Sequence, residues 1–400
     1  MSKNYVAYHV HTDLSLLDSA TNYKDMIDRA CELGQPAIAI TEHGNLFSWV
    51  SKKMYCDSKR IKYIHGCEVY LTETLQEKIK DNYHTILLAK NYEGVKELNE
   101  LVSRSYRDDH FYYKPRISFD EFLGTSKNII STSACLASPL RSLSPENPYF
   151  ERLVKHYNYL EIQPHSCNDQ RDFNIKLAIL SQQYGIPLIA GTDAHNLNAY
   201  KAECRTIIQY AKHIEFSQED EFDLTYKSYD ELVEAFRQQD AIPENLWMDA
   251  IENTVRMAET VEDFKIDESF KYPFLYGSKD AEILKQRIDD GLKEKIKSGA
   301  VTQEQIRPFQ EAVKEECEVF EQIDMMGFML FMSELATWCK SNGIPLGFNR
   351  GSCGGSRVAY LTDITDLNPE TWHTVFSRFA NSSRKEIGDC LMVSTCSDTC

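Results

Sequence analysis

Two histidines lie two residues apart near the start of the chain, and an aspartate follows them. His9, His11 and Asp18 belong to the run AYHVHTDLSLLDSA, residues 7–20. In a β-strand, residues i and i+2 point to the same face, so the two imidazoles would project side by side. Two imidazoles at a strand end form half of a typical transition-metal site. Two surface histidines are the alternative, and this stretch alone does not decide between them.

Other possible metal ligands occur at the ends of strand-like runs in the first half of the chain. His43 follows AIAIT and Glu68 follows HGC. Cys135 follows ISTSA, and both Asp193 and His195 follow LIAGT. His84 instead opens the run HTILLAK, which indicates a strand that enters from the other direction or carries its ligand at its start. In βα barrels, strand ends and their loops converge on the active site.

Each of these residues also has a structural interpretation. Cys135 suits a small core residue, because free cysteine is often buried. Asp18 could cap a turn, His84 could be a hydrogen-bonded core histidine, and Glu68 could be a solvated carboxylate at a sheet edge. Their joint placement is what favours a site.

The elements that carry these residues alternate between short apolar runs and helical patterns over residues 1–200. QPAIAITEHG is apolar without alternation, as a strand buried on both faces should be. YKDMIDRACELG predicts a helix with one apolar stripe and with Gly34 just after its end, and the stripe comprises Met26, Ile27, Ala30 and Leu33. Strands alternating with helices predict βα units in a parallel sheet or barrel.

Length and composition fit a globular protein of at least two domains. The chain has 400 residues, of which 42% are hydrophobic and 26% charged. No apolar run is long enough for a membrane span, and the N-terminus lacks the pattern of a signal peptide. Twelve cysteines occur without a CxxC pair, which favours a reducing cytoplasm. The net charge of −17 argues against nonspecific nucleic-acid binding by the whole chain but permits a local basic groove.

Several of these runs together resemble the PHP domain of bacterial and phage replicative DNA polymerase III alpha subunits. In order they are HVHTDLSLLD, TEHGNL, GCEVYL, YHTILLAKN, YYKPRIS, STSACLAS, YLEIQPH and GTDAHN. The resemblance implies a distorted βα barrel with a cluster of metal ions. The implied ligands are His9, His11, Asp18, His43, Glu68, His84, Cys135, Asp193 and His195. Glu42 departs from the pattern, since the family more often has aspartate there.

Nine ligands that include five imidazoles and a thiolate exceed what one zinc ion needs and do not suit magnesium or calcium. Two or three Zn²⁺, Mn²⁺ or Fe ions would account for them, and such clusters hydrolyse phosphate esters. In the family this implies removal of 3′-terminal nucleotides, with His11, Asp193 and His195 in the catalytic roles. His165 and Arg116 could contact a substrate phosphate, although a structural role is equally compatible with each.

The second half of the chain is predicted to be mostly helical, with helices closing the first domain at about residue 270. FKYPFLYGSKD, residues 270–280, is expected to be a linker. EQIRPFQEAVKEECEVFEQI keeps one apolar stripe, and GFMLFMSELATWCKSNG predicts a buried helix that ends near Gly343. A short strand, a glycine-rich loop and a helix start are expected in IPLGFNRGSCGGSRVAYL.

The segment NGIPLGFNRGSCGGSRVAYLTDITDLNP resembles the start of the polymerase III palm, a nucleotidyltransferase-like domain. There the glycine-rich loop holds the phosphates of the incoming nucleotide. The matching residues are Arg350, Gly351, Ser352, Gly355 and Ser356. Glycines permit close backbone approach to a phosphate, and the N–H groups of the following helix would be free to bind it.

The resemblance stops at Asp389, the remnant of the palm carboxylates. Residues 390–400 read CLMVSTCSDTC, with apolar residues where further aspartates are expected. This tail is interpreted as a frame-shifted or spliced end, or as a divergent one. The expected domains are thus 1–270, 271–389 and a non-matching tail. Without paired palm carboxylates we expect no polymerisation, and Mg²⁺ is expected only for an intact palm.

Three functions are compatible with these features. The first is the N-terminal part of a replicative polymerase alpha subunit with a working 3′–5′ exonuclease site. Its intact parent would bind a DNA primer end, an incoming dNTP and replisome subunits such as the sliding clamp, with no membrane contact. The second is a stand-alone phosphatase acting on a small phosphate ester, against which the palm-like segment argues. The third is a non-catalytic structural PHP domain, against which the complete ligand set argues.

Overall fold

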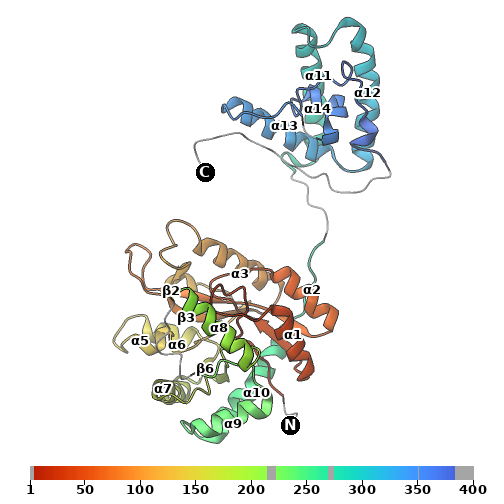
Figure 1. Ribbon diagram of the computed structural model, residues 1–400. Helices are drawn as coiled ribbons and strands as arrows, with labels where there is room; N and C mark the ends of the chain where they lie inside the picture. Colours follow the sequence, from red (N-terminus) through yellow and green to blue (C-terminus); the bar gives the residue numbers. More distant parts are fainter. Residues whose placement is uncertain (1–3, 214–221, 269–273, 350, 383–400) are drawn as a thin grey trace. The chain divides into compact units, whose positions relative to one another are not determined.

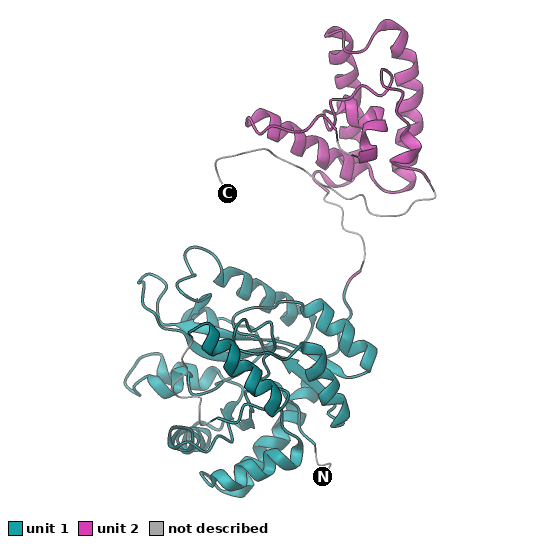
Figure 2. Cartoon of the chain, in the orientation of Figure 1, with its two compact units in different colours: residues 1–266 teal, residues 267–400 magenta. Residues whose placement is uncertain are grey.

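The computed structural model describes residues 4–213, 222–268, 274–349 and 351–382, which belong to two compact units (Figures 1 and 2). The first unit comprises residues 1–266 and the second residues 267–400. No helix within the described ranges combines the length and the apolar character needed to cross a membrane.

The first unit contains a mixed sheet built around one long strand. This strand, β2 (Lys62–Thr72), pairs in parallel with β1 (Ala37–Ile40) and with the short β4 (Arg116–Ser118). On its other side it pairs antiparallel with β3 (Tyr83–Ala89), which in turn pairs antiparallel with β5 (Ile129–Thr132). A separate parallel pair consists of β6 (Leu160–Ile162) and β7 (Leu188–Ala190).

Isolated bridges join these two sheets into a closed ring. Thr132 at the end of β5 bridges to Tyr159 before β6, and Ala194 after β7 bridges to Val10. Ala7 then bridges to Ile38 in β1, which completes the circuit. The ring is a barrel that is distorted by the antiparallel direction of β3, and the predicted distorted βα barrel is therefore confirmed.

Ten helices among the described residues belong to this unit and surround the ring (Figure 1). In order they are α1 (Tyr23–Glu32), α2 (Trp49–Lys59), α3 (Tyr92–Ser105), α4 (Phe119–Leu123), α5 (Pro139–Ser142), α6 (Phe150–His156), α7 (Asn168–Tyr184), α8 (Ala199–Ala211), α9 (Tyr229–Gln239) and α10 (Glu244–Thr260). Helix α10 packs on β7, α2 on β2, and α3 on β3. The helix predicted at residues 23–34 is confirmed: Met26, Ile27 and Ala30 are buried, and Gly34 has a φ of +67°.

The segment that carries His9 and His11 is not the strand that the sequence predicts. Within residues 7–11, only Ala7 and Val10 form bridges, and each bridge leads to a different neighbour. The segment fills the gap between β1 and the end of β7, so it has no continuous partner on either side. Both imidazoles are nevertheless fully buried.

The second unit is helical in its described part. It comprises η1 (Gly277–Lys279), α11 (Asp280–Lys297), α12 (Gln303–Gln322), α13 (Met326–Ser341), η2 (Gly351–Gly355), α14 (Arg357–Leu361) and η3 (Phe376–Arg378). Phe309, Cys317 and Phe320 of the predicted stripe are buried in its core. The short strand expected before the glycine-rich loop is not formed: only Leu346 has bridge geometry. An isolated bridge does not extend into a strand without a paired neighbour.

Candidate metal centre

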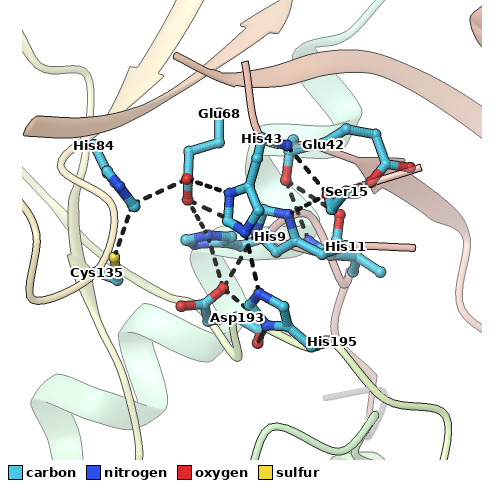
Figure 3. A network of polar contacts seen from close by, with 12 residues as sticks. His9, His11, Ser15, Glu42, His43, Glu68, His84, Cys135, Asp193 and His195 are labelled. Carbon is cyan, nitrogen blue, oxygen red and sulfur yellow. Dashed lines mark hydrogen bonds and ion pairs between the residues drawn. The ribbon is translucent and has the colours of Figure 1, made fainter. Parts of the chain in front are cut away.

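The carboxylate of Glu68 lies at the middle of a cluster of imidazoles (Figure 3). Strand β2 carries Glu68, whose side chain is fully buried. Its Oε1 atom lies 2.7 Å from His43 Nδ1 and 2.9 Å from His84 Nδ1, and its Oε2 atom lies 3.0 Å from His9 Nε2. A single carboxylate therefore connects three segments of the barrel.

A second group of imidazoles stacks beside this carboxylate. The ring of His11 lies 4.0 Å from that of His43 and 4.3 Å from that of His195. Asp18 Oδ2 lies 2.9 Å from His43 Nε2 and 3.5 Å from His195 Nε2. Three stacked imidazoles with a carboxylate at their nitrogen atoms resemble a set of metal ligands more than a hydrogen-bonded core.

The direction of β3 brings His84 to the same end of the barrel. Because β3 runs antiparallel to β2, the first residues of β3 lie beside the last residues of β2, and His84 pairs with Tyr70. Cys135, which follows β5, places its Sγ atom 3.5 Å from His84 Nδ1. Of the two alternatives that the sequence left open for His84, the structure shows the strand that enters from the opposite direction.

Two buried atoms at the centre point at one another without hydrogen-bonding. Asp193 Oδ1 lies 3.1 Å from His9 Nε2 and 3.3 Å from His11 Nε2, but neither Asp193 Oδ1 nor His11 Nε2 makes a contact with hydrogen-bond geometry among the described residues. Buried polar atoms without partners are costly, and a bound ion is one way to satisfy them. Three sets of donor atoms have members that all lie within 4.8 Å of one another: His11, His43 and His195; His9, His11, Glu68 and Asp193; and Glu68, His84 and Cys135. These donors fit divalent metal ions.

The protonation of the cluster depends on burial and on the neighbouring charges. Burial opposes ionisation of Glu68, yet His84 and His43 hold the pKa of its carboxyl well below the usual range. Burial also disfavours the cation of His43, but Glu68 and Asp18 raise its pKa to about 10. For His11, burial and the charges of His43 and His195 act together and lower the pKa to about 3. His11 is therefore neutral near pH 7 and has a nitrogen lone pair available for a metal ion.

Glu161 of β6 orients His9 from behind. His9 Nδ1 donates to Glu161 Oε1 at 2.6 Å, while Glu161 also accepts from Thr132 Oγ1 and Gln163 Nε2. A carboxylate on one imidazole nitrogen directs the other nitrogen toward the metal. The side chain passes over Gly191, where a Cβ atom would lie only 2.0 Å from Glu161 Oε1. Gly191 is thus required by the close approach of Glu161.

A second buried network holds His11. Ser15 Oγ lies 3.1 Å from His11 Nδ1 and donates to Glu42 Oε2 at 2.5 Å. Glu42 also accepts from Lys52 Nζ of α2 at 2.8 Å, in an ion pair that is almost completely buried. Burial raises the pKa of Glu42, but Lys52 and the hydroxyls of Ser15 and Thr12 lower it to about 2. Glu42 is therefore an ionised anchor behind the centre and not a ligand in it.

The centre opens into a cavity of about 940 Å³. Asp18, His43, His84, Cys135, Asp193 and His195 line its floor. Asp18 is fixed by Arg205 of α8, which donates to Asp18 Oδ1 and to its backbone carbonyl. All nine residues expected to bind metal thus lie around one cavity or directly beneath it.

Two further candidates lie elsewhere. Arg116 of β4 is buried and donates to the carbonyls of Ile79 and Asp81, which makes it an anchor for that loop. His165 is buried against Phe222, and burial lowers its pKa to about 4. Neither residue is among those lining the cavity.

In the second unit, the helix N-terminus expected to be free is already occupied. Glu316 of α12 accepts from the backbone N–H groups of Arg357 and Val358 and from the hydroxyl of Ser356. Gly355 faces the carbonyl of Val375, which a Cβ atom would approach to 2.5 Å. The expectation of free N–H groups at this helix is therefore wrong, because an internal carboxylate binds them. Gly351 and Ser352 are exposed, whereas Arg350 and Asp389 lie outside the described residues.

Comparison with known proteins agrees with this arrangement. Residues 7–165 match the family model of the PHP domain, and residues 282–392 match that of the bacterial DNA polymerase III alpha NTPase domain. A DNA polymerase III subunit alpha from Borreliella burgdorferi is 34% identical over 96% of this chain and 34% of its own length. The corresponding subunit from Aquifex aeolicus is 31% identical over 100% of this chain and 36% of its own length.

The chain belongs to the DNA polymerase III alpha subunit family. It spans about a third of the length of the relatives it matches. Among solved structures, a candidate metal-dependent phosphoesterase from Bifidobacterium adolescentis is 14% identical, with a TM-score of 0.35 over 49% of this chain and 89% of its own. The first unit has the PHP fold of the family, and the ligand-type residues of its motifs converge within it.

Sequence reasoning missed the residues that hold the ligands in place. Glu161 stands within the quoted motif YLEIQPH, and Glu42 was noted only as a departure from the family pattern. A carboxylate in the middle of an apolar strand was the available signal, since such a group is rarely buried without a partner. Arg205 and Lys52 lie on helices with no distinguishing pattern.

Proposed function

We propose that the PHP unit is a metal-dependent phosphodiesterase that removes nucleotides from the 3′ end of DNA. The observation that carries the proposal is the convergence of eight ligand-type side chains, Glu68 among them, into three overlapping sets of close donor atoms, with Asp18 beside His43 and His195. The donors would hold two or three Zn²⁺, Mn²⁺ or Fe ions. When bound, such ions activate a water molecule and neutralise the charge of a phosphate.

The side chains of the chain itself have separate tasks in this proposal. Glu161 and Ser15 fix the orientation of His9 and His11, so that the Nε2 atom of His9 faces Glu68 and that of His11 faces Asp193. Asp193 holds an ionised carboxylate at the cavity floor, because His9 and His195 outweigh the effect of burial and keep its pKa well below the usual range. The cavity of about 940 Å³ opens to solvent, which is compatible with entry of a chain end.

The remaining assignments are proposals that follow from the family. We propose that residues 1–270 act as the PHP domain and residues 271–389 as the start of the palm. The loop at Gly351 and Ser352 is proposed to face nucleotide phosphates in the intact protein, with Arg350 as the cation. DNA, a dNTP, replisome subunits and a cytoplasmic location belong to the same proposal, as does the absence of polymerisation in this chain.

A 3′-labelled single-stranded oligonucleotide tests the nuclease directly. The purified chain with Mn²⁺ or Zn²⁺ is expected to release labelled mononucleotide, and chelator or the substitution His11→Ala should abolish the release. Tyr210→Ala, which changes an exposed tyrosine outside the cavity, is the control. Tightly bound metal without any release would contradict the catalytic proposal and favour a structural PHP domain.

A further inference from the structure

Aromatic side chains gather at the mouth of the metal-centre cavity. Tyr106, Phe111 and Tyr113 all line the cavity and keep 48%, 46% and 65% of their surface exposed. They belong to the loop between α3 and β4. Exposed apolar side chains that gather around a cavity often mark a binding surface, whereas exposed apolar residues scattered singly are normal on a monomer.

Lysines accompany these rings. Lys114 lines the same cavity, Lys80 Nζ lies 4.1 Å from the ring centroid of Tyr113, and Lys78 Nζ lies 5.9 Å from that of Tyr112. Among the described residues, none of the three lysines forms an ion pair. The carboxylates of the neighbouring segment face a different hollow of about 700 Å³, which is lined by Glu73, Glu77, Asp81 and Asp120 among others. The loop also carries the exposed carboxylates of Asp108 and Asp109, so the lysines are individual cations beside the rings and the surface is not uniformly cationic.

The loop is held in place beside the metal centre. Pro115 packs so closely on Gly44, which directly follows His43, that a Cβ atom on Gly44 would lie 2.7 Å from Pro115 Cγ. Tyr113 has a φ of +60°, a left-handed conformation that is unusual for a bulky residue. Strained residues of this kind occur where the surrounding structure fixes a side chain for a purpose. Here the fixed side chain is an exposed ring at the mouth of the cavity.

We propose that the loop of residues 106–114 is a stacking platform for the unpaired bases next to the scissile phosphate of a single-stranded nucleic acid. This inference rests on the proposed function, and it names the part of the chain that selects an oligonucleotide over a small phosphate ester. Flat exposed rings stack on bases of any sequence, and unpaired lysines attract the phosphate backbone. A paired duplex end does not offer its bases and binds less well.

Binding without hydrolysis tests the platform separately from the nuclease. The wild-type chain and the Tyr113→Ala variant are titrated, in chelator, with a fluorescent oligothymidylate and with the same strand carrying abasic sites at its 3′ end. The loss of one stacked base predicts that Tyr113→Ala weakens binding of the intact strand at least about fivefold, whereas Tyr113→Phe restores it. Tyr210→Ala, a substitution at an exposed tyrosine outside the cavity, should bind as the wild type does.

The effects of Tyr113→Ala and of removing the 3′ bases from the oligonucleotide should not be additive. With the abasic strand, Tyr113→Ala should cost little, because the base that the ring contacts is already gone. Lys114→Gln should weaken both strands and reduce the slope of log affinity against log salt by about 0.7, whereas Lys127→Gln should not. Equal losses for intact and abasic strands, unchanged binding of the intact strand, or equal affinity for a blunt duplex would each overturn the platform. A chain that passes these tests but hydrolyses nothing would contradict only the proposed nuclease.

Discussion

A single methyl group placed outside the ligand set should weaken the metal centre. In Gly191→Ala, the new Cβ atom would lie 2.0 Å from Glu161 Oε1 and 2.5 Å from its Cδ atom. Ordinary contact begins at about 3.4 Å, so the carboxylate must move by about 1.4 Å. Gly191 does not have a positive φ, and alanine brings no backbone strain of its own.

The displaced carboxylate can no longer hold His9. The hydrogen bond from His9 Nδ1 to Glu161 Oε1 is 2.6 Å long and buried, and a bond of this charged type contributes about 1.5–3 kcal/mol. Loss of such an outer partner typically lowers metal affinity about 10- to 100-fold, which corresponds to about 1.4–2.7 kcal/mol. The two ranges overlap, so we expect Gly191→Ala to weaken metal binding about 10- to 100-fold.

Competition with a chromogenic chelator measures this affinity for Zn²⁺ or Co²⁺. Glu161→Gln should give a similar loss, because it keeps the shape of the side chain and removes its charge. Gly347→Ala adds the same methyl group where nothing lies within 4 Å and should bind metal as the wild type does. If Gly191→Ala bound metal within twofold of wild type while Gly347→Ala behaved normally, the assignment of Glu161 as the support of His9 would be refuted.

Three further outcomes follow from the structure. Removal of metal by chelator should lower the melting temperature of the first unit, and Asp193→Ala should lose most of that shift, as calorimetry can show. Glu316→Ala should destabilise the second unit by about 2–4 kcal/mol in denaturant titration, because three donors lose their buried acceptor. Burial raises the pKa of Glu316 above 4.5, so the stability linked to its proton is present at low pH and is lost as pH rises through the folded-state pKa. Glu316→Gln should flatten that pH dependence, and an unchanged slope would contradict the assignment.

The sequence was sufficient for the parts of the fold that depend on local pattern. Apolar runs such as AIAI and the stripe of Met26, Ile27 and Ala30 predicted β1 and α1, because burial on one or both faces leaves a periodic signal. The place of His84 at the start of its run indicated either a reversed strand or a ligand at the strand start, and the structure shows that β3 is reversed. Most of the candidate ligands stand beside such runs, but the full set of nine came from the resemblance to the PHP motifs.

Contacts between segments far apart in the chain could not be predicted from local sequence pattern. The segment with His9 and His11 has two separate bridges in place of a strand, and nothing in its own residues shows that these bridges lead to different neighbours. The occupied helix start at Arg357 depends on Glu316, forty residues away from Ser356 in the chain. Supports such as Lys52 and Arg205 act across elements, and helical pattern alone does not distinguish them from surface cations.

The location of bound metal tests the central claim most directly. Crystals of the chain grown with Zn²⁺ or Mn²⁺ can be measured at the absorption edge of the metal, so that anomalous scattering locates each ion. We predict two or three peaks around Glu68, within reach of His9, His11, His43, His84, Cys135, Asp193 and His195. Peaks found only at the protein surface, or none near Glu68 at saturating metal, would contradict the account.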